Sequence, residues 1–307
     1  MGTSYSVLGL RLDSEVPLPE LPVWTGDGTG DGAGPADVTV RLGSPALRAI
    51  PFVSGAEADV AADGTVRVEG NGVGTFLVRN GSEILVDART PVADPALRAY
   101  VLGSALAVIC HQRGVLPLHA AALASPRGII LLVGESGAGK STLSAALTAR
   151  GLGLVAEDLA PLSWTDEARP PLALPSVPRL KLSPEALRRH GHAPDTLPEL
   201  PGSGGKRALH LPLAPAGEVV AVCHLHKAVP GDEPHLEPMD GMAVLASLQR
   251  NVLHWPTALD LGRGPAVFRR LALLSRQVPH RCLRRLEGLN RLEETAALVL
   301  RLAEGGA

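Results

Sequence analysis

The chain has 307 residues, of which 45% are hydrophobic and 20% charged, and its formal net charge is −2. This composition is typical of a globular protein and excludes the strongly basic balance of most nucleic-acid-binding proteins, while aromatic residues, at 3%, are too scarce for a base-stacking surface. Three widely spaced cysteines do not indicate a disulfide framework, and no apolar run is long enough to span a membrane, so we expect a cytoplasmic protein that binds neither nucleic acid nor a membrane.

The first 93 residues are expected to form a β-rich N-terminal domain that takes part in substrate recognition. Residues 25–37, rich in Gly and Asp, are expected to form a flexible loop. The Asn80-Gly81 pair favours the positive φ angles of a type I′ hairpin turn. Four segments alternate apolar and polar residues, as half-buried strands do: 38–42, 65–70, 74–80 and 82–87.

Residues 94–307 are expected to form an α/β domain. A helix is predicted at 94–112, because Asp94 can cap its N-terminus and Pro95 suits its first position. Later helices are predicted near 184–190, 239–250, 265–277 and 290–303, with a mobile loop at 194–207 and a strand at 218–225. Between the first helix and these later elements, a β-loop-α-β unit typical of nucleotide-binding cores is predicted. It consists of a strand-like segment at 116–123, a strand at 128–133, a glycine-rich loop, a helix at 141–150 and a strand at 152–156.

The glycine-rich segment at 134–142 reads GESGAGKST and fits the phosphate-binding pattern G-x-x-x-x-G-K-[ST]. Glycines let backbone amides converge on phosphate oxygens without a side chain in the way, and the positive end of the following helix points at the same anions. Lys140 would contact the β- and γ-phosphates, and Ser141 would bind Mg²⁺. The expected nucleotide-binding residues are Gly134, Glu135, Ser136, Gly137, Ala138, Gly139, Lys140, Ser141 and Thr142.

Two carboxylates, Glu157 and Asp158, follow the next strand, 17 and 18 residues beyond Lys140. A strand that follows so directly is expected to lie near the strand before the loop, so that its carboxyl end brings both side chains to the phosphates. One carboxylate can hold Mg²⁺ and the other can accept a proton from an attacking hydroxyl, and the sequence leaves their order open. The alternative is that one caps the following segment and the other is solvated.

A histidine precedes the loop: His119 ends the segment GVLPLH, 21 residues before Lys140. A lone histidine at a strand end is most often a hydrogen-bonded structural residue. Its spacing alone does not assign it a catalytic role.

With His119, the loop and the acidic pair in this order, the chain resembles the HPr kinase/phosphorylase family, whose core fold is shared with phosphoenolpyruvate carboxykinase. That family has a histidine at a strand end, a G-[DE]-S-G-x-G-K-S loop and an acidic pair closing the next strand, and GESGAGKS is its form of the loop. Through YSVLGLRLDSEVPLPELP, QRGVLPLHAAAL and PSVPRLKL, the similarity extends to kinase-like relatives that include lasso-peptide precursor kinases. The resemblance implies a P-loop core with a smaller β-rich N-terminal domain, and a homo-oligomer.

The resemblance also implies site roles. Lys140 and the loop amides would hold ATP, while Ser141 and Asp158 would hold Mg²⁺. Glu157 would be the base for the acceptor hydroxyl, with His119 supporting it. Either carboxylate could be the base and either the metal ligand.

A transferring phosphoryl group also needs a cation to balance the charge on its oxygens. Arg179 is a candidate for this catalytic role. Lys181, Lys206 and Arg207 are further candidates, although solvated basic residues are the ordinary interpretation of all four.

Two departures from the family pattern narrow these expectations. Glu157 stands where HPr kinases usually have aspartate, and its extra methylene shifts the geometry of that position. The glycine- and arginine-containing segment that bifunctional enzymes carry after the acidic pair is not found. Phosphorylase activity and HPr as the acceptor are therefore not implied.

We expect an ATP- and Mg²⁺-dependent kinase that transfers the γ-phosphoryl group to a Ser or Thr hydroxyl of a peptide or small protein, such as a lasso-type precursor peptide. The alternatives are a kinase for a free amino acid or metabolite, a P-loop ATPase acting as a switch or assembly factor, and a nucleotide-binding scaffold without turnover. A switch needs a residue that positions water rather than an acceptor base. ATP turnover alone, compared with turnover in the presence of candidate hydroxyl substrates, therefore distinguishes a switch from a kinase. Labelled phosphate in a metabolite rather than a peptide would indicate a small-molecule kinase, and unchanged function of Glu157→Gln and Asp158→Asn would indicate a scaffold.

Overall fold

The computed structural model describes residues 2–26, 34–43, 52, 53, 55, 58–228, 233–286, 289 and 291–305. Its architecture is mixed α/β, and the described strands form sheets of eight, nine and two strands. The chain divides into two compact units, Met1–Val115 with His254–Pro265, and Leu116–Leu253 with Ala266–Ala307. The division into domains 1–93 and 94–307 stays a prediction.

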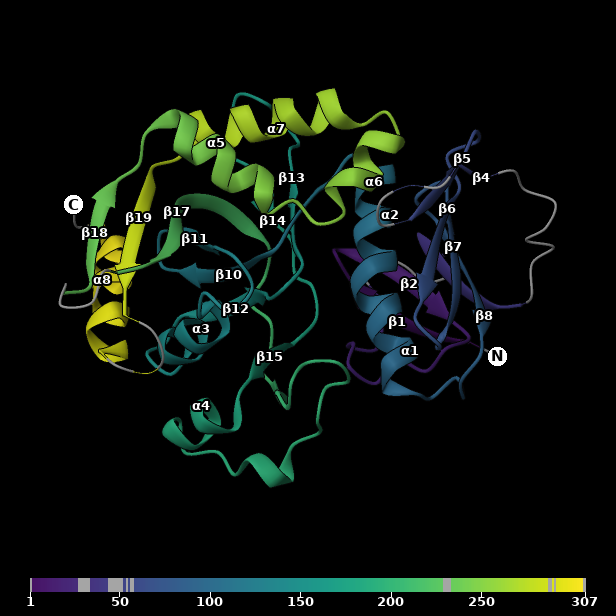
Figure 1. Ribbon diagram of the computed structural model, residues 1–307, viewed down its shortest axis with the longest axis horizontal. Helices are drawn as coiled ribbons and strands as arrows, with labels where there is room; N and C mark the ends of the chain where they lie inside the picture. The colour runs from purple at the N-terminus through teal and green to yellow at the C-terminus, as the bar shows by residue number, and fades with distance from the viewer. Residues whose placement is uncertain are drawn as a thin grey trace. The chain divides into compact units, whose positions relative to one another are not determined.

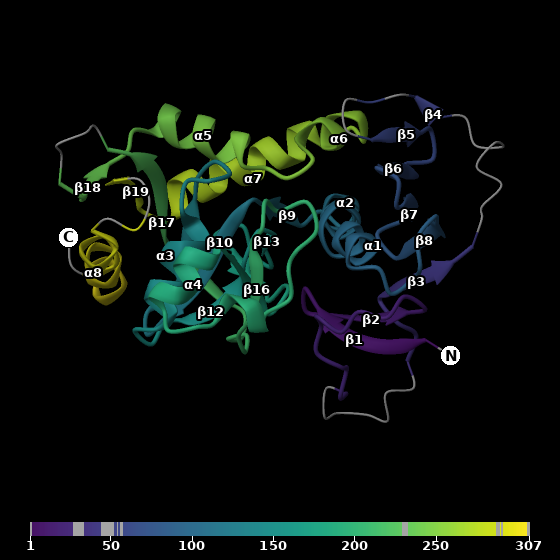
Figure 2. The ribbon, with the colours of Figure 1, turned by 60° about the horizontal axis from the view of Figure 1, so that its bottom comes forward.

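The first unit is built on the eight-stranded sheet (Figure 1), in the order β1-β2-β3-β8-β7-β6-β5-β4, which can be followed from bottom to top in Figure 2. The pairs β2–β3 and β3–β8 are parallel, and the other neighbours are antiparallel. The strands are β1 (Thr3–Val7), β2 (Leu10–Ser14), β3 (Val38–Leu42), β4 (Phe52–Val53), β5 (Asp59–Ala61), β6 (Val66–Gly70), β7 (Gly74–Arg79) and β8 (Glu83–Ala88).

The turn between β7 and β8 is the predicted hairpin. Asn80 and Gly81 have φ angles of 53° and 65°, as a type I′ turn requires at its two central positions. Residues 27–33 of the predicted loop at 25–37 lie outside the described residues.

The predicted helix at 94–112 is confirmed as α1 (Pro95–Tyr100), a π-helical segment η2 (Val101–Ala105) and α2 (Leu106–Gln112). The Asp94 side chain accepts a hydrogen bond from the backbone N–H of Ala96 at 2.8 Å, which satisfies a donor that a helix N-terminus leaves free. The ring of Phe76 on β7 stacks on Tyr100, with centroids 5.5 Å apart. A further short helix of this unit, α6 (Trp255–Asp260), contacts α2 and β5.

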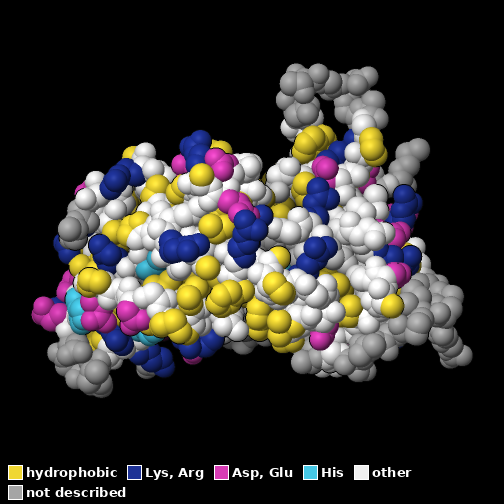
Figure 3. Space-filling model, turned by 90° about the horizontal axis from the view of Figure 1, so that it is seen from above, with side chains coloured by type: hydrophobic (Ala, Val, Ile, Leu, Met, Phe, Trp, Pro, Cys, Tyr) yellow, Lys and Arg dark blue, Asp and Glu magenta, His cyan; other side chains and the backbone are white. Residues whose placement is uncertain are grey.

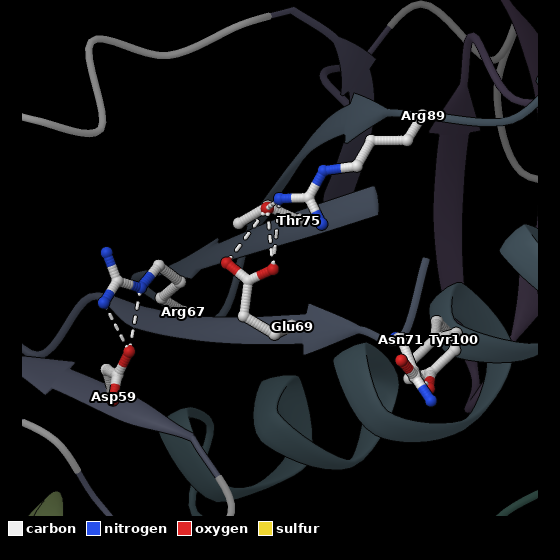
Figure 4. Close-up of polar contacts among 7 residues, drawn as sticks. All are labelled: Asp59, Arg67, Glu69, Asn71, Thr75, Arg89 and Tyr100. Carbon is white, nitrogen blue, oxygen red and sulfur yellow. Dashed lines mark hydrogen bonds and ion pairs between the residues drawn. The ribbon is translucent and has the colours of Figure 1, made fainter. Parts of the chain in front are cut away.

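Charged and polar side chains connect neighbouring strands of this sheet (Figure 4). Glu69 and Thr75 are directly opposite on β6 and β7, and the Thr75 hydroxyl lies 3.0 Å from Glu69 Oε1. Arg89 donates to the Thr75 hydroxyl oxygen at 2.9 Å, and Arg67 Nε donates to Asp59 Oδ2 at 2.9 Å. Cross-strand pairs of this kind support strand register more than stability, because water screens exposed charges.

The second unit contains the nine-stranded sheet, in the order β12-β10-β11-β17-β14-β13-β9, with β19 paired to β17 and β18 to β19. Its strands are β9 (Leu116–Leu118), β10 (Ala120–Ser125), β11 (Gly128–Val133), β12 (Gly153–Ala156), β13 (Ala160–Ser163), β14 (Leu172–Ala173), β17 (Gly217–Lys227), β18 (His235–Pro238) and β19 (His280–Arg285). A separate ribbon pairs β15 (Arg179–Leu182) with β16 (Arg207–His210). The helices are α3 (Lys140–Thr148), α4 (Pro184–Arg189), a 3₁₀ turn η3 (Pro194–Thr196), α5 (Gly241–Arg250), α7 (Gly264–Gln277), which starts in the first unit, and α8 (Leu292–Glu304).

The order of the central strands determines which residues lie at the end of the sheet where β11 finishes. Strand β10 lies between β11 and β12 and is antiparallel to both. Consequently β11 and β12 run in the same direction, and their carboxyl ends reach the same edge. The prediction that β12 lies near β11 is confirmed, with β10 between them.

The segment at 116–123, predicted as one strand, is two strands separated at His119. Leu116–Leu118 pairs with β13, whereas Ala120–Ser125 pairs with β11 and β12. Pattern alone could not detect this break, because both halves are apolar and fully buried. Strands β13, β14, β16, β18 and β19 were not predicted either, since their sequences lack a clear alternation.

Helix α3 packs its apolar side on the sheet, and Figures 1 and 2 both show it beside β10 and β12. Its buried residues Leu143, Ala146 and Leu147 join a core cluster with Leu123 and Leu132. This burial holds the N-terminus of α3 against the end of β11. Within the described part of the chain, no helix combines the length and apolar character needed to cross a membrane.

Basic and acidic side chains are interspersed with hydrophobic ones on the face shown in Figure 3. This mixture agrees with the small net charge of −2. Exposed large hydrophobic residues include Met242 on α5, with 78% of its surface accessible, and Phe268 on α7. Single exposed hydrophobic residues are ordinary on protein surfaces.

We expect Leu132→Ala to lower the free energy of unfolding by about 2–5 kcal/mol, because the removed methyl groups leave a cavity in a close-packed core. Leu132 is fully buried on β11. Urea denaturation measures the change, with the exposed Met242→Ala as control, for which we expect a change within about 0.5 kcal/mol. Equal effects of the two substitutions would contradict the assignment of Leu132 to the core.

Candidate functional site

The glycine-rich loop connects β11 to α3 in a backbone conformation that needs glycine. Gly137 and Gly139 have φ angles of 83° and 92°, in the left-handed region that other residues rarely adopt. A Cβ atom on Gly139 would also collide with the guanidinium of Arg285, which donates to the Ala138 carbonyl. Loop and helix therefore form the predicted strand-loop-helix unit, with the helix beginning one residue earlier, at Lys140.

The Lys140 ammonium lies folded against the loop that precedes it. Its Nζ donates to the carbonyl oxygens of Gly134 at 2.6 Å and Glu135 at 3.2 Å, and only 5% of the residue is exposed. Burial lowers the pKa of Lys140, although the carboxylates of Asp158 and Glu157 act in the opposite direction. A buried cation at this position would gain strongly from an anion in the loop.

Glu157 follows β12 and lies against the first turn of α3. The Ser141 hydroxyl donates to its Oε1, while its Oε2 is buried and has no hydrogen-bond partner. Burial raises the pKa of Glu157 to about 8, and the neighbouring Asp158 raises it as well. Near neutral pH and without a cation, this carboxyl group is therefore largely protonated.

Asp158 occupies an uncommon backbone conformation, with φ at 64° in a turn closed by the N–H of Leu159 and the carbonyl of Glu157 at 2.8 Å. Non-glycine residues in such conformations occur disproportionately at functional sites. The turn directs Asp158 toward Lys181, whose ammonium forms an ion pair with Oδ2, and toward His119, whose Nε2 lies 3.8 Å from Oδ1. Burial alone would raise the pKa of Asp158, but Lys181 and the other nearby cations hold it below its ordinary value.

His119 lies at the junction of β9 and β10. Its backbone N–H donates to the carbonyl of Asn251 at 2.7 Å, which ties the junction to the end of α5. Burial lowers the pKa of its imidazole to about 4, with a further contribution from the ammonium of Lys140. The ring is therefore neutral at physiological pH and can both donate and accept a hydrogen bond.

Two cavities adjoin the loop, and Ser136 and Gly137 line both. The smaller, of about 160 Å³, is lined by His119, Ser136, Gly137, Gly139, Lys140, Ser141, Thr142, Asp158, Lys181, Ser183 and Lys206. The larger, of about 450 Å³, is lined by Gly134, Glu135, Ser136, Gly137, Ala138, Leu225, His226, Lys227, Ser247, Arg250, Asn251, Arg285 and Leu286. We refer to them as the small cavity and the large cavity.

Most of the predicted site residues thus meet in one region of the second unit, although their roles stay predictions. Glu157 lies behind Ser141 and lines neither cavity. Arg179 is buried on β15, lowers the pKa of Glu157 through its charge, and also lines neither cavity. Arg207 forms an ion pair with Glu199 at 3.4 Å and lines neither cavity.

Sequence reasoning missed residues that line the cavities from elsewhere in the chain. Arg285 ends β19, and Ser247 and Asn251 come from the end of α5. Strand β19 is parallel to β17, which is parallel to β11, so its carboxyl end reaches the loop edge as well. Identifying β19 as a parallel strand would have pointed to Arg285.

Three oxygen-bearing side chains at the loop, those of Ser141, Glu157 and Asp158, are of the kind that Mg²⁺ prefers. The buried, unpartnered Oε2 of Glu157 next to the Ser141 hydroxyl fits a cation held there. Among the residues that the structure describes, no group of three or more His, Cys, Asp or Glu side chains could hold a metal ion by itself.

Comparisons with known proteins show a distant similarity to solved structures. No family model matches the chain, and no curated protein matches it. Among solved structures, the chain is similar to the HPr(Ser) kinase/phosphatase from Coxiella burnetii, at 17% identity over 62% of this chain and 91% of that one, with a TM-score of 0.35. Values this low do not establish a shared function.

We expect Glu157→Gln to stabilise the protein increasingly as the pH rises from about 5 to 8. A raised folded-state pKa means that Glu157 contributes stability that is full below its ordinary pKa of 4.5 and is lost as the pH rises through about 8. Glutamine does not ionise, so the variant escapes this loss, which is on the order of a few kcal/mol. Urea denaturation at several pH values measures it.

Glu185→Gln, on an exposed position of α4, is the matched control for this pH series. Its difference from the wild type should stay constant across the range. A Glu157→Gln difference that also stays constant would contradict the raised pKa.

Proposed function

We propose that the protein is an ATP- and Mg²⁺-dependent kinase of the HPr-kinase-like type, which transfers the γ-phosphoryl group to a Ser or Thr hydroxyl of a peptide or small protein. The small cavity carries this proposal. In it, the phosphate-loop residues Lys140 and Ser141 face a carboxylate, Asp158, that can accept a proton. A motor or switch needs the loop but not an acceptor base beside it.

The phosphates would lie in the glycine-rich loop. Its left-handed glycines let the backbone approach an anion closely, and the N-terminus of α3 adds its positive dipole. Lys140, which now donates to the loop's own carbonyls, would exchange these acceptors for phosphate oxygens. The exchange would give the buried ammonium a negatively charged partner in place of two uncharged carbonyl groups.

Mg²⁺ would be held by Ser141 and Glu157. The hydroxyl and the carboxyl group already touch, and the free Oε2 is the remaining lone-pair site. When bound, Mg²⁺ neutralises charge on the phosphate oxygens, as in other P-loop enzymes. A cation at this position also favours the ionised form of Glu157, against the effect of burial.

The acceptor hydroxyl would be activated by Asp158 rather than by Glu157. Asp158 lines the small cavity and is kept ionised by Lys181, whereas Glu157 is buried behind Ser141. This order reverses the one implied by family resemblance. Neutral His119, close to Asp158 Oδ1, would orient the carboxylate and the hydroxyl.

Charge balance on the transferring group would come from Lys181 and Lys206. Both line the small cavity. The carbonyl of Lys206 accepts a hydrogen bond from the N–H of Leu200 at 2.9 Å, which closes the loop between these two residues. Arg179 lies outside that lining and would act on Glu157 instead. Preorganised cations of this kind commonly supply much of the catalysis in phosphoryl transfer.

The size of the small cavity favours a macromolecular acceptor. Its volume of about 160 Å³ is below the range of pockets that enclose whole small molecules, roughly 300–1,000 Å³. A hydroxymethyl group presented by a peptide fits this space, while the rest of the peptide stays outside. We therefore favour a peptide over a free amino acid. The resemblance to lasso-peptide precursor kinases makes a ribosomally made precursor peptide the first candidate to test.

Incubation with Mg-ATP and a precursor peptide encoded next to the protein should add one phosphate to the peptide, as measured by mass spectrometry. We expect Lys140→Met to abolish the product and Asp158→Asn to lower kcat by about 10²-fold or more. Asp195→Asn, exposed in η3, is the control and should match the wild type. Steady ATP hydrolysis that no hydroxyl substrate alters, with no phosphorylated product, would overturn the proposal.

The two carboxylates should differ in their dependence on Mg²⁺. Glu157→Gln should raise the Mg²⁺ concentration that gives half-maximal activity, by about tenfold or more, because it weakens a metal ligand. Asp158→Asn should lower kcat at saturating Mg²⁺ and leave that concentration nearly unchanged. Titration of phosphate transfer with MgCl₂ separates them, and the opposite pattern would restore the reversed roles.

A further inference from the structure

Three buried side chains form a continuous hydrogen-bonded chain that ends at the large cavity. His280 Nε2 lies 3.2 Å from the carbonyl oxygen of Leu274, and His280 Nδ1 lies 2.9 Å from His224 Nε2. His224 Nδ1 lies 2.8 Å from the Ser247 hydroxyl. The kinase chemistry proposed above uses none of these groups.

The Leu274 carbonyl at one end determines which atom donates in each hydrogen bond of this chain. Leu274 O can only accept, so His280 Nε2 carries a proton, and the Nδ1 of its neutral ring is an acceptor. His224 must then donate through Nε2 and accept through Nδ1. The Ser247 hydroxyl consequently donates to His224, and its oxygen is left with lone pairs only.

Both rings stay neutral, which keeps this order of protons intact. Burial lowers the pKa of His224 to about 3, and His280 lowers it further. The pKa of His280 is also lowered by burial. The direction of donation therefore does not change over the physiological pH range.

The same wall of the large cavity carries a second oriented acceptor. Asn251 lies one helical turn after Ser247, and its side-chain amide donates to the Ser247 carbonyl at 2.8 Å. This bond directs the amide nitrogen into the helix and leaves Asn251 Oδ1 as an acceptor. The end of α5 thus presents fixed acceptors beside Leu225 and Leu286.

The large cavity is placed and sized for the nucleoside part of a nucleotide. Its volume of about 450 Å³ lies within the range of small-molecule pockets. Ser136 and Gly137 line both cavities, so a nucleotide with its γ-phosphate in the small cavity would extend past them into the large one. The guanidinium of Arg250, which also lines it, can stack on a planar ring.

We propose that Ser247, oriented by His224 and His280, selects adenine by accepting a hydrogen bond from its exocyclic amine. This inference rests on the proposed function, since it assumes that a nucleotide occupies the loop. Guanine and hypoxanthine carry a carbonyl oxygen at the same ring position. That oxygen and the Ser247 hydroxyl oxygen would both be acceptors, so no hydrogen bond could form between them. His224 and His280 are positioning residues, which act only through the Ser247 hydroxyl.

The test compares ATP with ITP, which differ at this ring position by an amine and a carbonyl oxygen. The wild type should bind ATP about tenfold or more tightly than ITP, measured by calorimetry, and Ser247→Ala should bring the ratio close to one. His224→Leu should also reduce the ratio, because the hydroxyl can then rotate and donate to ITP. Ser275→Ala, at a helical serine that donates to the Ala272 carbonyl, is the matched control and should keep the wild-type ratio.

The outcomes distinguish a failure of the base assignment from a failure of the kinase proposal. An unchanged ATP-to-ITP ratio in Ser247→Ala, with phosphate transfer intact, overturns the base assignment and leaves the kinase proposal standing. A Ser247→Ala effect on the ratio of ATP to dATP, rather than of ATP to ITP, means that the ribose is the partner and overturns it as well. ATP binding with the predicted ratios but no transfer to any hydroxyl supports the base assignment and overturns the kinase, and no binding of either nucleotide overturns both.

Discussion

The hydrogen bond from the Ser141 hydroxyl to Glu157 joins the two segments on which the candidate site depends. Ser141 belongs to the first turn of α3, and Glu157 follows the last residue of β12. They meet because β10 separates β11 and β12 and so makes both end at the same edge of the sheet. Asp158 comes next in the chain, in a left-handed turn, and its carboxylate lies beside Lys181 and His119.

Burial and charge together give these adjacent carboxyl groups different properties. Glu157, enclosed behind Ser141, has its pKa raised to about 8, whereas the lysine beside Asp158 keeps that group ionised. Two titratable groups whose environments move their pKa values apart are a common feature of sites that combine metal binding with proton transfer. The same surroundings keep the imidazole of His119 neutral, because burial and the nearby Lys140 disfavour a further positive charge.

Local patterns predicted a large part of this arrangement. The turn at Asn80-Gly81, the capped helix after Asp94 and the loop-helix unit at 134–148 all depend on contacts close in sequence, and all three are confirmed. Patterns failed where long-range partners decide the structure. The apolar segment around His119 looks like one strand, yet its halves pair with different strands, because strand identity depends on which neighbours supply the hydrogen bonds.

By itself, the sequence determined the glycine-rich loop, the helix that follows it and the presence of two carboxylates after the next strand, since glycine conformation and hydrophobic periodicity are local properties. Only the tertiary structure decided that Asp158 lines the small cavity while Glu157 does not, and that Lys181 rather than Arg179 pairs with it. It alone revealed the chain of His224, His280 and Ser247. Residues so far apart in sequence become neighbours only when β17, β19 and α5 pack together, and no local pattern encodes that packing.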